Sequence, residues 1–276
     1  MKNSSLVSVD WLYENFNNKD VIILDASPSS NVSGLTPKFA DLKIKNALPF
    51  DMERIFVDHT NPVPNMFPSK EVFETEVRKL GISNTSLIVV YDNLGIYTSP
   101  RARWMFKTFG HNYVYVLDGG LTAWKDAGFP CEPREFSLVK KMGDFKAEYD
   151  KNLVVTADSV LKNIKSKSAL VCDARGAVRF NAEGPEPRPG MKSGHIPNSK
   201  NIPFKSVLAD GKLKSVSELK NLFREVDLNE NLIFTCGSGV TACIIMLAAE
   251  QISSGHKALY DGSWAEWGAG DYPVEK

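Results

Sequence analysis

Residues 21–26 read VIILDA and residues 169–174 read ALVCDA, so an apolar run closes on Asp-Ala twice in one chain. The two aspartates carry the numbers 25 and 173, an interval of 148 residues. Other stretches repeat at nearly the same interval, such as LIVVY at 87–91 with LIFT at 232–235. An interval this long, found once, indicates a duplicated domain rather than a short-period repeat protein.

Within each copy, short apolar strands alternate with segments of helical pattern. A polar residue stands where each first helix would begin, Ser8 before residues 9–16 and Thr156 before residues 157–164, as helix N-caps do. Strands that are apolar throughout are typical of parallel sheets covered on both faces. We therefore expect an α/β protein of two tandem domains, each a mainly parallel sheet flanked by helices. The expected boundaries are a first domain at 1–130, a linker at 131–151 and a second domain at 152–276.

The composition argues against several classes of protein. The 276 residues carry 33 basic and 33 acidic side chains, and this balance disfavours a nucleic-acid-binding or polybasic membrane-binding surface. No apolar run is long enough to span a bilayer, and the N-terminus lacks the pattern of a secretory signal. Four cysteines without a CxxC pair indicate neither a disulfide scaffold nor a zinc ribbon. We expect a cytoplasmic protein that uses no metal or organic cofactor.

The strand at 232–235 is followed by CGSGVTAC at 236–243 and then by an apolar helical run. Ligands of open α/β sheets bind at the carboxyl ends of strands. Gly237 and Gly239 allow backbone conformations that a Cβ disfavours, and successive N–H groups at a helix start can then form a nest for an anion. Such surroundings favour ionised thiols, since helix N-termini lower thiol pKa values from about 8.5 to about 3.5–7.5. Cys236 is therefore the candidate nucleophile, with inert burial at a strand end as the alternative.

The matching position in the first copy is Asp92, which has neither a thiol nor a compact glycine loop around it. The first copy therefore cannot run the same chemistry, and we expect it to wall the site and supply supporting groups. The other cysteines are interpreted as structural. Cys172 lies inside a strand, Cys243 lies on the helix after the loop and is expected to pack inward, and Cys131 lies in the linker, where a redox role stays open.

A long Pro- and Gly-rich loop at 174–190 follows the strand that ends at Asp173. It carries three arginines, Arg175, Arg179 and Arg188. Arginine binds carboxylates through a planar fork, so arginines beside an activated thiolate predict a small anionic substrate. The alternative is that they pair on the surface with two glutamates of the same loop, Glu183 and Glu186.

Two further side chains are weaker candidates. Glu53 is a possible supporting group for a cleft between the domains, with a plain surface carboxylate as the alternative. His195, in SGHIP at 193–197, is a candidate base, but its turn context favours a structural hydrogen bond.

These motifs resemble those of the two-domain sulfurtransferases of the rhodanese superfamily, over essentially the whole chain. The most specific one is CGSGVT at 236–241, which is similar to the loop of members that take sulfur from 3-mercaptopyruvate. Members that use thiosulfate tend to carry a basic loop, CRKGVT. Further matches are EPRPG at 186–190, GHIP at 194–197 and SPR at 99–101.

The resemblance implies that Cys236 accepts sulfur as a persulfide, releases pyruvate and passes the sulfur to thioredoxin or a small thiol, or to cyanide in an assay. It assigns the substrate carboxylate to Arg179 and Arg188, and assistance of proton transfer to Ser238. The remaining loop residues would offer backbone N–H groups to the persulfide: Gly237, Gly239, Val240 and Thr241. A neutral loop near the sulfur, with arginines further out, suits a donor whose charge is on a distant carboxylate.

The sequence departs from the family at one place. Members often hold an acid and a histidine in the first domain, which are proposed to form a relay with the loop serine. Glu53 matches the acid, but the histidine position falls on Asn65, whose amide cannot titrate. His59 lies six residues earlier and is an unsupported substitute. The relay is therefore doubtful in this chain.

Three other functions stay open at this stage. A thiosulfate:cyanide sulfurtransferase is disfavoured by the missing basic side chains of the loop. A cysteine phosphatase would need an arginine just after the loop, where Ala242 and Cys243 stand. A sulfur carrier without turnover is possible on the fold alone, and the intact CGSGVT loop argues against it.

Overall fold

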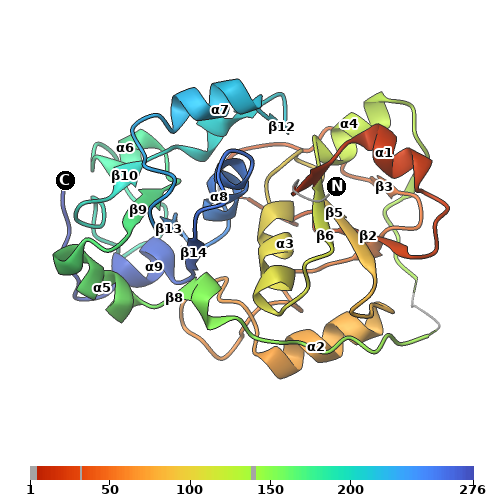
Figure 1. The fold of residues 1–276 in the computed structure, drawn as a ribbon, viewed down its shortest axis with the longest axis horizontal. Coiled ribbons are helices and arrows are strands. Elements are labelled where there is room, and N and C mark those ends of the chain that lie inside the picture. Colours follow the sequence, from red (N-terminus) through yellow and green to blue (C-terminus); the bar gives the residue numbers. More distant parts are fainter. Residues whose placement is uncertain (1–4, 32, 138–140) are drawn as a thin grey trace. The chain divides into compact units, whose positions relative to one another are not determined.

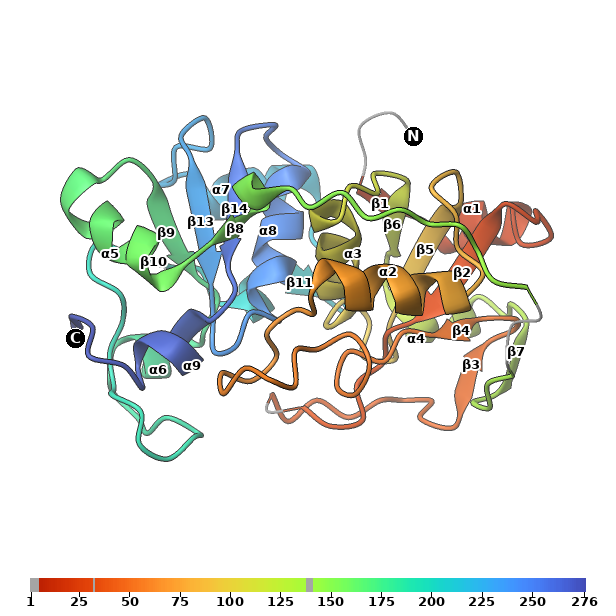
Figure 2. The same cartoon turned by 90° about the horizontal axis from the view of Figure 1, so that it is seen from below.

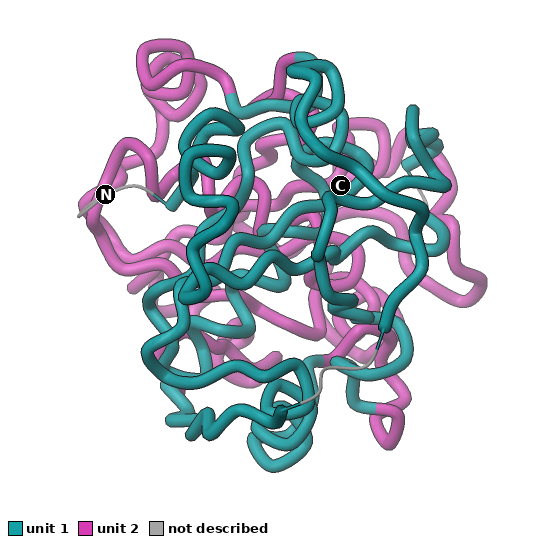
Figure 3. Tube along the Cα trace, turned by 90° about the vertical axis from the view of Figure 1, so that its right-hand side faces the viewer, with its two compact units in different colours: residues 1–58, 67–150, 210–213 teal, residues 59–66, 151–209, 214–276 magenta. Residues whose placement is uncertain are grey.

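The computed structural model describes residues 5–31, 33–137 and 141–276, and its contacts divide the chain into two compact units (Figure 3). Unit 1 comprises residues 1–58, 67–150 and 210–213, and unit 2 comprises residues 59–66, 151–209 and 214–276. Two short segments thus belong to a different unit from the residues on either side of them in the sequence. Segment 59–66 belongs to unit 2, and segment 210–213 belongs to unit 1.

Unit 1 is built on a five-stranded sheet in the order β1-β6-β5-β2-β4, in which every pairing is parallel (Figure 1). Its strands are β1 (Leu6–Val7), β2 (Val21–Asp25), β4 (Leu48–Pro49), β5 (Leu87–Tyr91) and β6 (Val114–Leu117). Its helices are α1 (Val9–Glu14), α2 (Lys70–Lys79), α3 (Ser99–Thr108) and α4 (Gly120–Asp126). A separate antiparallel pair joins β3 (Leu42–Ile44) to β7 (Cys131–Pro133).

The apolar runs of the sequence become strands because both faces of the sheet are covered. In β5, Val89 and Tyr91 pack in one cluster with Leu12 of α1 and Trp124 of α4. Alternate residues of a strand point to opposite faces, and the intervening Ile88 is fully buried as well. A strand buried on both faces has no place for the polar residues of an alternating pattern.

Unit 2 repeats this plan with a parallel sheet in the order β10-β9-β13-β14-β8. Its strands are β8 (Val154–Val155), β9 (Leu170–Asp173), β10 (Lys200–Asn201), β13 (Leu232–Thr235) and β14 (Lys257–Tyr260). Its helices are α5 (Ala157–Ser166), α6 (Ala177–Phe180), α7 (Val216–Leu222), α8 (Ala242–Glu250) and α9 (Ser263–Trp267). The remaining short elements are the 3-10 turns η1 (Lys151–Leu153) and η2 (Phe204–Val207), and the strands β11 (Leu208–Ala209) and β12 (Lys212–Leu213).

Read from opposite edges, the two strand orders correspond, with β1, β2, β4, β5 and β6 matching β8, β9, β10, β13 and β14. The duplicated, mainly parallel α/β architecture predicted from the sequence is therefore confirmed. The predicted N-caps are confirmed too, because Ser8 Oγ accepts from the N–H of Trp11 and Thr156 Oγ1 accepts from the N–H of Ser159. Among the described residues, no helix is both long and apolar enough to cross a membrane.

Part of the segment predicted as a linker is bound to unit 1. Beyond the pairing of β7 with β3, the chain from residue 141 runs alongside α2 (Figure 2), where the N–H of Gly143 donates to the carbonyl of Arg78 at 2.8 Å. Phe145 is fully buried there. Unit 1 thus includes residues well beyond residue 130. The predicted division into residues 1–130, 131–151 and 152–276 stays a prediction.

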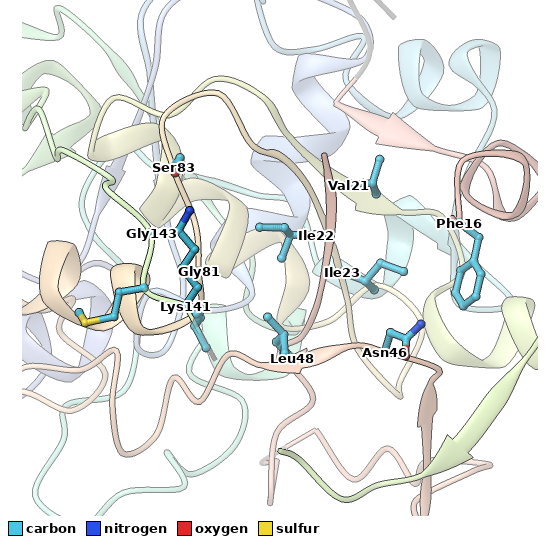
Figure 4. A pocket seen from close by; sticks show the side chains of 12 residues that line it. Phe16, Val21, Ile22, Ile23, Asn46, Leu48, Gly81, Ser83, Lys141 and Gly143 are labelled. Atoms are coloured by element: carbon cyan, nitrogen blue, oxygen red, sulfur yellow. The ribbon is translucent and has the colours of Figure 1, made fainter. Parts of the chain in front are cut away.

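Unit 1 contains a cavity of about 440 Å³ beside the first residues of β2 (Figure 4). Its lining includes Phe16, Ile23, Leu48 and Lys141. The cavity lies toward the amino end of β2, whereas ligand sites of parallel sheets lie beyond the carboxyl ends of strands. The position expected for a ligand site is therefore at the opposite ends of the strands.

Candidate active site

The loop at 236–241 leads directly from β13 into α8, at the carboxyl end of the central strand of unit 2 (Figure 1). Ser263, the first residue of α9, holds it in place. The Ser263 Oγ accepts from the N–H of Cys236 at 3.2 Å and from the N–H of Gly239 at 3.1 Å, and it donates to the carbonyl of Tyr260 at 2.8 Å. Ser263 is fully buried and has a φ of 50°, so its three bonds hold a left-handed backbone that is uncommon for serine.

The loop is also tied through its own carbonyls. The N–H of Trp264 donates to the carbonyl of Cys236 at 3.0 Å, and the N–H of Ala265 donates to that of Gly237 at 2.9 Å. Cys236 is 2% exposed, so its thiol is held at the base of the loop. The first turn of α9 therefore fixes the loop around Cys236 from one side.

The two glycines have different roles, and the expectation that both serve unusual backbone conformations is wrong for Gly237. Gly239 has a φ of 76°, in the left-handed region that favours glycine. Gly237 is not among the residues of positive φ. A Cβ on Gly237 would stand 3.3 Å from Nη2 of Arg179, so the missing side chain lets the guanidinium approach the loop.

Most backbone N–H groups of the loop are not used by the protein. Within residues 5–31, 33–137 and 141–276, the N–H groups of five of the six positions 237–242 have no acceptor: Gly237, Ser238, Val240, Thr241 and Ala242. The N–H of Gly239 was predicted to bind the persulfide, but it already donates to Ser263. The N–H groups of Val240, Thr241 and Ala242 lie at the start of α8, where the helix dipole also favours an anion.

Ser238 receives two donors in this structure. Asn65 Nδ2 donates to Ser238 Oγ at 2.8 Å, and Arg188 Nη2 donates to it at 3.5 Å. Asn65 belongs to segment 59–66, which groups with unit 2. The predicted substrate arginine Arg188 and the predicted loop serine are thus in direct contact.

Arg179 is held by a buried carboxylate. Its Nη2 donates to Oε2 of Glu186 at 2.5 Å and its Nε donates to Oε1 at 3.2 Å. The Glu186 side chain is 2% exposed, whereas that of Arg179 is 25% exposed. The pairing with Glu186, which was considered for the surface, does form. The glutamate is buried, however, and part of the Arg179 guanidinium stays open to solvent. The burial of Glu186 was not foreseen from the sequence.

Arg175 is structural. It is 2% exposed, its guanidinium donates to both carboxylate oxygens of Asp173 and to Glu186 Oε1, and it lies 4.0 Å above the ring of Trp264. With its charge paired on two sides and its face covered, it is not open to a substrate. Glu186 therefore bridges a buried arginine to a partly exposed one.

The two weaker candidates lie in defined places. His195 stacks on the ring of Phe180 at 3.8 Å, and its Nδ1 lies 2.9 Å from the Phe180 carbonyl, which confirms the structural role predicted for it. Glu53 is an exposed residue of unit 1, where its carboxylate accepts from the N–H of Ser29 at 3.2 Å and from the Ser29 hydroxyl.

The remaining cysteines are buried or partly buried free thiols. Burial raises the pKa of Cys172 to about 12, and Cys243 is buried on α8, where its thiol donates to the carbonyl of Gly239 at 3.4 Å. Cys131 lies on β7 rather than in an irregular linker, and burial raises the pKa of its thiol. The structural interpretation of Cys172 and Cys243 is confirmed.

Two copies of a parallel α/β domain, one of them with a cysteine opening a glycine loop into a helix, define a class of protein. The chain belongs to the rhodanese family: the Rhodanese-like domain matches residues 8–127 and 156–269.

Individual relatives match at full length. The chain is 38% identical to 3-mercaptopyruvate sulfurtransferase of Escherichia coli K12, covering 100% of this chain and 99% of the relative. It is 39% identical to thiosulfate sulfurtransferase of Gallus gallus, over 95% of this chain and 93% of the relative. The crystal structure of SseA from Escherichia coli, a 3-mercaptopyruvate sulfotransferase, superimposes with a TM-score of 0.83 at 34% identity, covering 95% of this chain and 100% of SseA.

Proposed function

We propose that this protein is a sulfurtransferase that takes sulfur from 3-mercaptopyruvate onto Cys236, releases pyruvate and passes the sulfur to a thiol acceptor. The observation that carries the proposal is the loop itself. It places a cysteine at the end of β13 among backbone N–H groups that have no acceptor within the described residues. The full-length relatives named for this reaction support the choice of donor.

In the first half-reaction, the Cys236 thiolate attacks the sulfur of 3-mercaptopyruvate and an S–S bond forms. The bond between that sulfur and the donor's carbon breaks, and its electron pair passes into the adjacent ketone as an enolate. Protonation of the enolate carbon gives pyruvate, and the enzyme keeps a persulfide. In the second half, an acceptor thiolate attacks the outer sulfur and the Cys236 thiolate leaves, which makes the cycle a double displacement.

Each loop and arginine residue has a proposed task in this cycle. The solvent-open part of Arg179 and the guanidinium of Arg188 bind the donor carboxylate, since arginine matches its two oxygens. Ser238 assists proton transfer and donates to the ketone oxygen as charge develops there. The unclaimed N–H groups of Gly237, Val240 and Thr241 bind the persulfide, and Gly239 shapes the loop.

Thiosulfate is the second candidate donor, because a relative at 39% identity carries that name. Thiosulfate holds its charge next to the transferred sulfur, and positive side chains in the loop would suit it. Residues 237–241 read GSGVT and carry none. A donor whose charge lies on a remote carboxylate fits the position of the arginines better.

Several finer points belong to the same proposal. We propose residues 1–130 as the domain without a catalytic cysteine, residues 152–276 as the catalytic domain, and Glu53 as a supporting group. Thioredoxin or a small thiol is the proposed acceptor. The four cysteines are free thiols, which agrees with a reducing compartment such as the cytoplasm.

The test compares both donors on one preparation of the purified protein. We expect pyruvate release from 3-mercaptopyruvate with a dithiol acceptor to exceed thiosulfate turnover in kcat/KM. Cys236→Ser should abolish both while keeping the thermal unfolding profile, and Cys131→Ser, which removes a thiol of unit 1, should change neither. Turnover that survives Cys236→Ser would reject the mechanism.

The persulfide can be observed directly. Intact-mass measurement after 3-mercaptopyruvate alone should show a gain of one sulfur atom on Cys236, which a dithiol removes. An adduct that forms and persists when the acceptor is added would instead identify a sulfur carrier.

A further inference from the structure

Asn65 is the donor closest to the hydroxyl of Ser238. It lies in segment 59–66, which the contacts group with unit 2. Its amide Nδ2 is 2.8 Å from Ser238 Oγ, although 173 residues separate the two in sequence. Asn65 has a φ of 64°, a left-handed conformation that asparagine adopts more readily than most residues do. The left-handed backbone of Asn65 is thus one that asparagine tolerates, and its side-chain amide contacts the loop.

A second donor approaches the same oxygen. Arg188 Nη2 lies 3.5 Å from Ser238 Oγ. A serine hydroxyl has two lone pairs and one proton. When both lone pairs accept, the proton must point away from both donors. Among the residues that the structure describes, the Ser238 hydroxyl has no acceptor for that proton.

We infer that Asn65 is a positioning residue, which holds Ser238 as a hydrogen-bond donor toward the substrate. This inference rests on the function proposed above. With Asn65 donating, the Ser238 proton is available for the ketone oxygen of the donor molecule, where negative charge develops as the carbon–sulfur bond breaks. Neither an amide nor a guanidinium changes its protonation between about pH 5 and pH 10, so the direction of the Ser238 proton does not depend on pH.

Three variants separate this role from a merely structural one. Asn65→Gly removes the amide at a left-handed position without backbone strain. Asn65→Asp keeps the shape but replaces the donor by an acceptor, which captures the Ser238 proton. Asn46→Gly is the matched control, because Asn46 is an exposed residue of unit 1 with a φ of 65°.

The measurement is a double-mutant cycle on pyruvate release, with each Asn65 variant in the Ser238 and Ser238→Ala backgrounds. We expect Asn65→Gly to lower kcat about five- to tenfold with KM little changed, the loss of one hydrogen bond that acts in the transition state. Asn65→Asp should lose more than Asn65→Gly, with the deficit constant from about pH 6 to pH 9. In the Ser238→Ala background both Asn65 variants should have almost no further effect, and Asn46→Gly should match the unaltered protein.

Equal losses in the two backgrounds would overturn the inference, because the effect of Asn65 would not pass through Ser238. An Asn65→Asp variant as active as Asn65→Gly would overturn it as well. Those results, with a protein whose turnover needs Cys236, would leave the proposed function standing. If the unaltered protein released no pyruvate at all, the proposed function would fail and this inference with it.

Discussion

The two units use the same position of the same fold in opposite ways. In unit 1 the central strand β5 is followed by Asp92, and in unit 2 the corresponding β13 is followed by Cys236. Asp92 is fully buried, and its carboxylate accepts from four backbone N–H groups and one hydroxyl at 2.7–3.0 Å. These donors are the N–H groups of Leu94, Tyr97, Thr98 and Ser99, and the Ser99 hydroxyl.

This difference shows that the fold places several backbone N–H donors after the central strand in both units, although only unit 2 has a candidate nucleophile there. In unit 1 a side chain of the protein fills the nest, because the Asp92 carboxyl accepts all five bonds. Burial nevertheless raises the pKa of Asp92, so desolvation outweighs these hydrogen bonds. In unit 2 a shorter loop carries a thiol, and its donors are left for a bound anion or a persulfide.

The largest expected effect comes from moving the carboxylate of unit 1 into unit 2. Cys236→Asp should abolish sulfur transfer, by about three orders of magnitude or more, because the nucleophile is gone. At the same time the new carboxylate can accept the unclaimed N–H groups of the loop, as Asp92 does. We therefore expect Cys236→Asp to unfold at a higher temperature than Cys236→Ala at neutral pH.

Cys236→Asn serves as the control for that comparison, since it has nearly the same shape and no charge. Thermal unfolding of the three variants, followed by calorimetry, should rank Asp above Asn and Asn above or equal to Ala. If Asp proved the least stable, the loop would not be an anion nest, and the likeness of the two units would end at the strand.

The next largest effect is expected from removing the Asp92 carboxylate, which accepts the donors of unit 1. Asp92→Ala leaves four N–H groups and a hydroxyl without their acceptor in a buried place, which should lower the free energy of unfolding by about 3–5 kcal/mol. Asp92→Asn keeps one oxygen as an acceptor and should lose less. Urea denaturation of the three proteins measures both changes. A loss for Asp92→Ala within about 1 kcal/mol would show that the donors find other partners.

The sequence predicts what is encoded locally. The bounds of β5 and β13 and the caps Ser8 and Thr156 follow from apolar runs and single polar residues beside them. Cys236 was predictable because strand, glycines and helix are contiguous.

Contacts that depend on the tertiary fold were beyond such reasoning. The approach of Asn65 to Ser238 spans 173 residues; no local pattern predicts it, and only the family resemblance, whose relay histidine falls on Asn65, pointed to that position. The support that Ser263 gives the loop depends on how α9 meets β13, which no local pattern predicts. The pairing of Arg179 with Glu186 was foreseen, but burial of that glutamate depends on packing around Arg175.

The smallest expected effect concerns the close approach that Gly237 permits. In Gly237→Ala the new Cβ would lie 3.3 Å from Nη2 of Arg179, close enough to displace the guanidinium by a few tenths of an ångström but not to break its pairing with Glu186. Because Arg179 is proposed to bind the donor carboxylate in both the ground state and the transition state, KM should rise by about two- to fivefold with kcat unchanged. Gly176→Ala is the matched control, since a Cβ there meets nothing within 4 Å, and its KM should be that of the unaltered protein. A fall in kcat for Gly237→Ala at constant KM would mean that Gly237 acts through the backbone conformation of the loop, as Gly239 does. The two glycines would then have the same role.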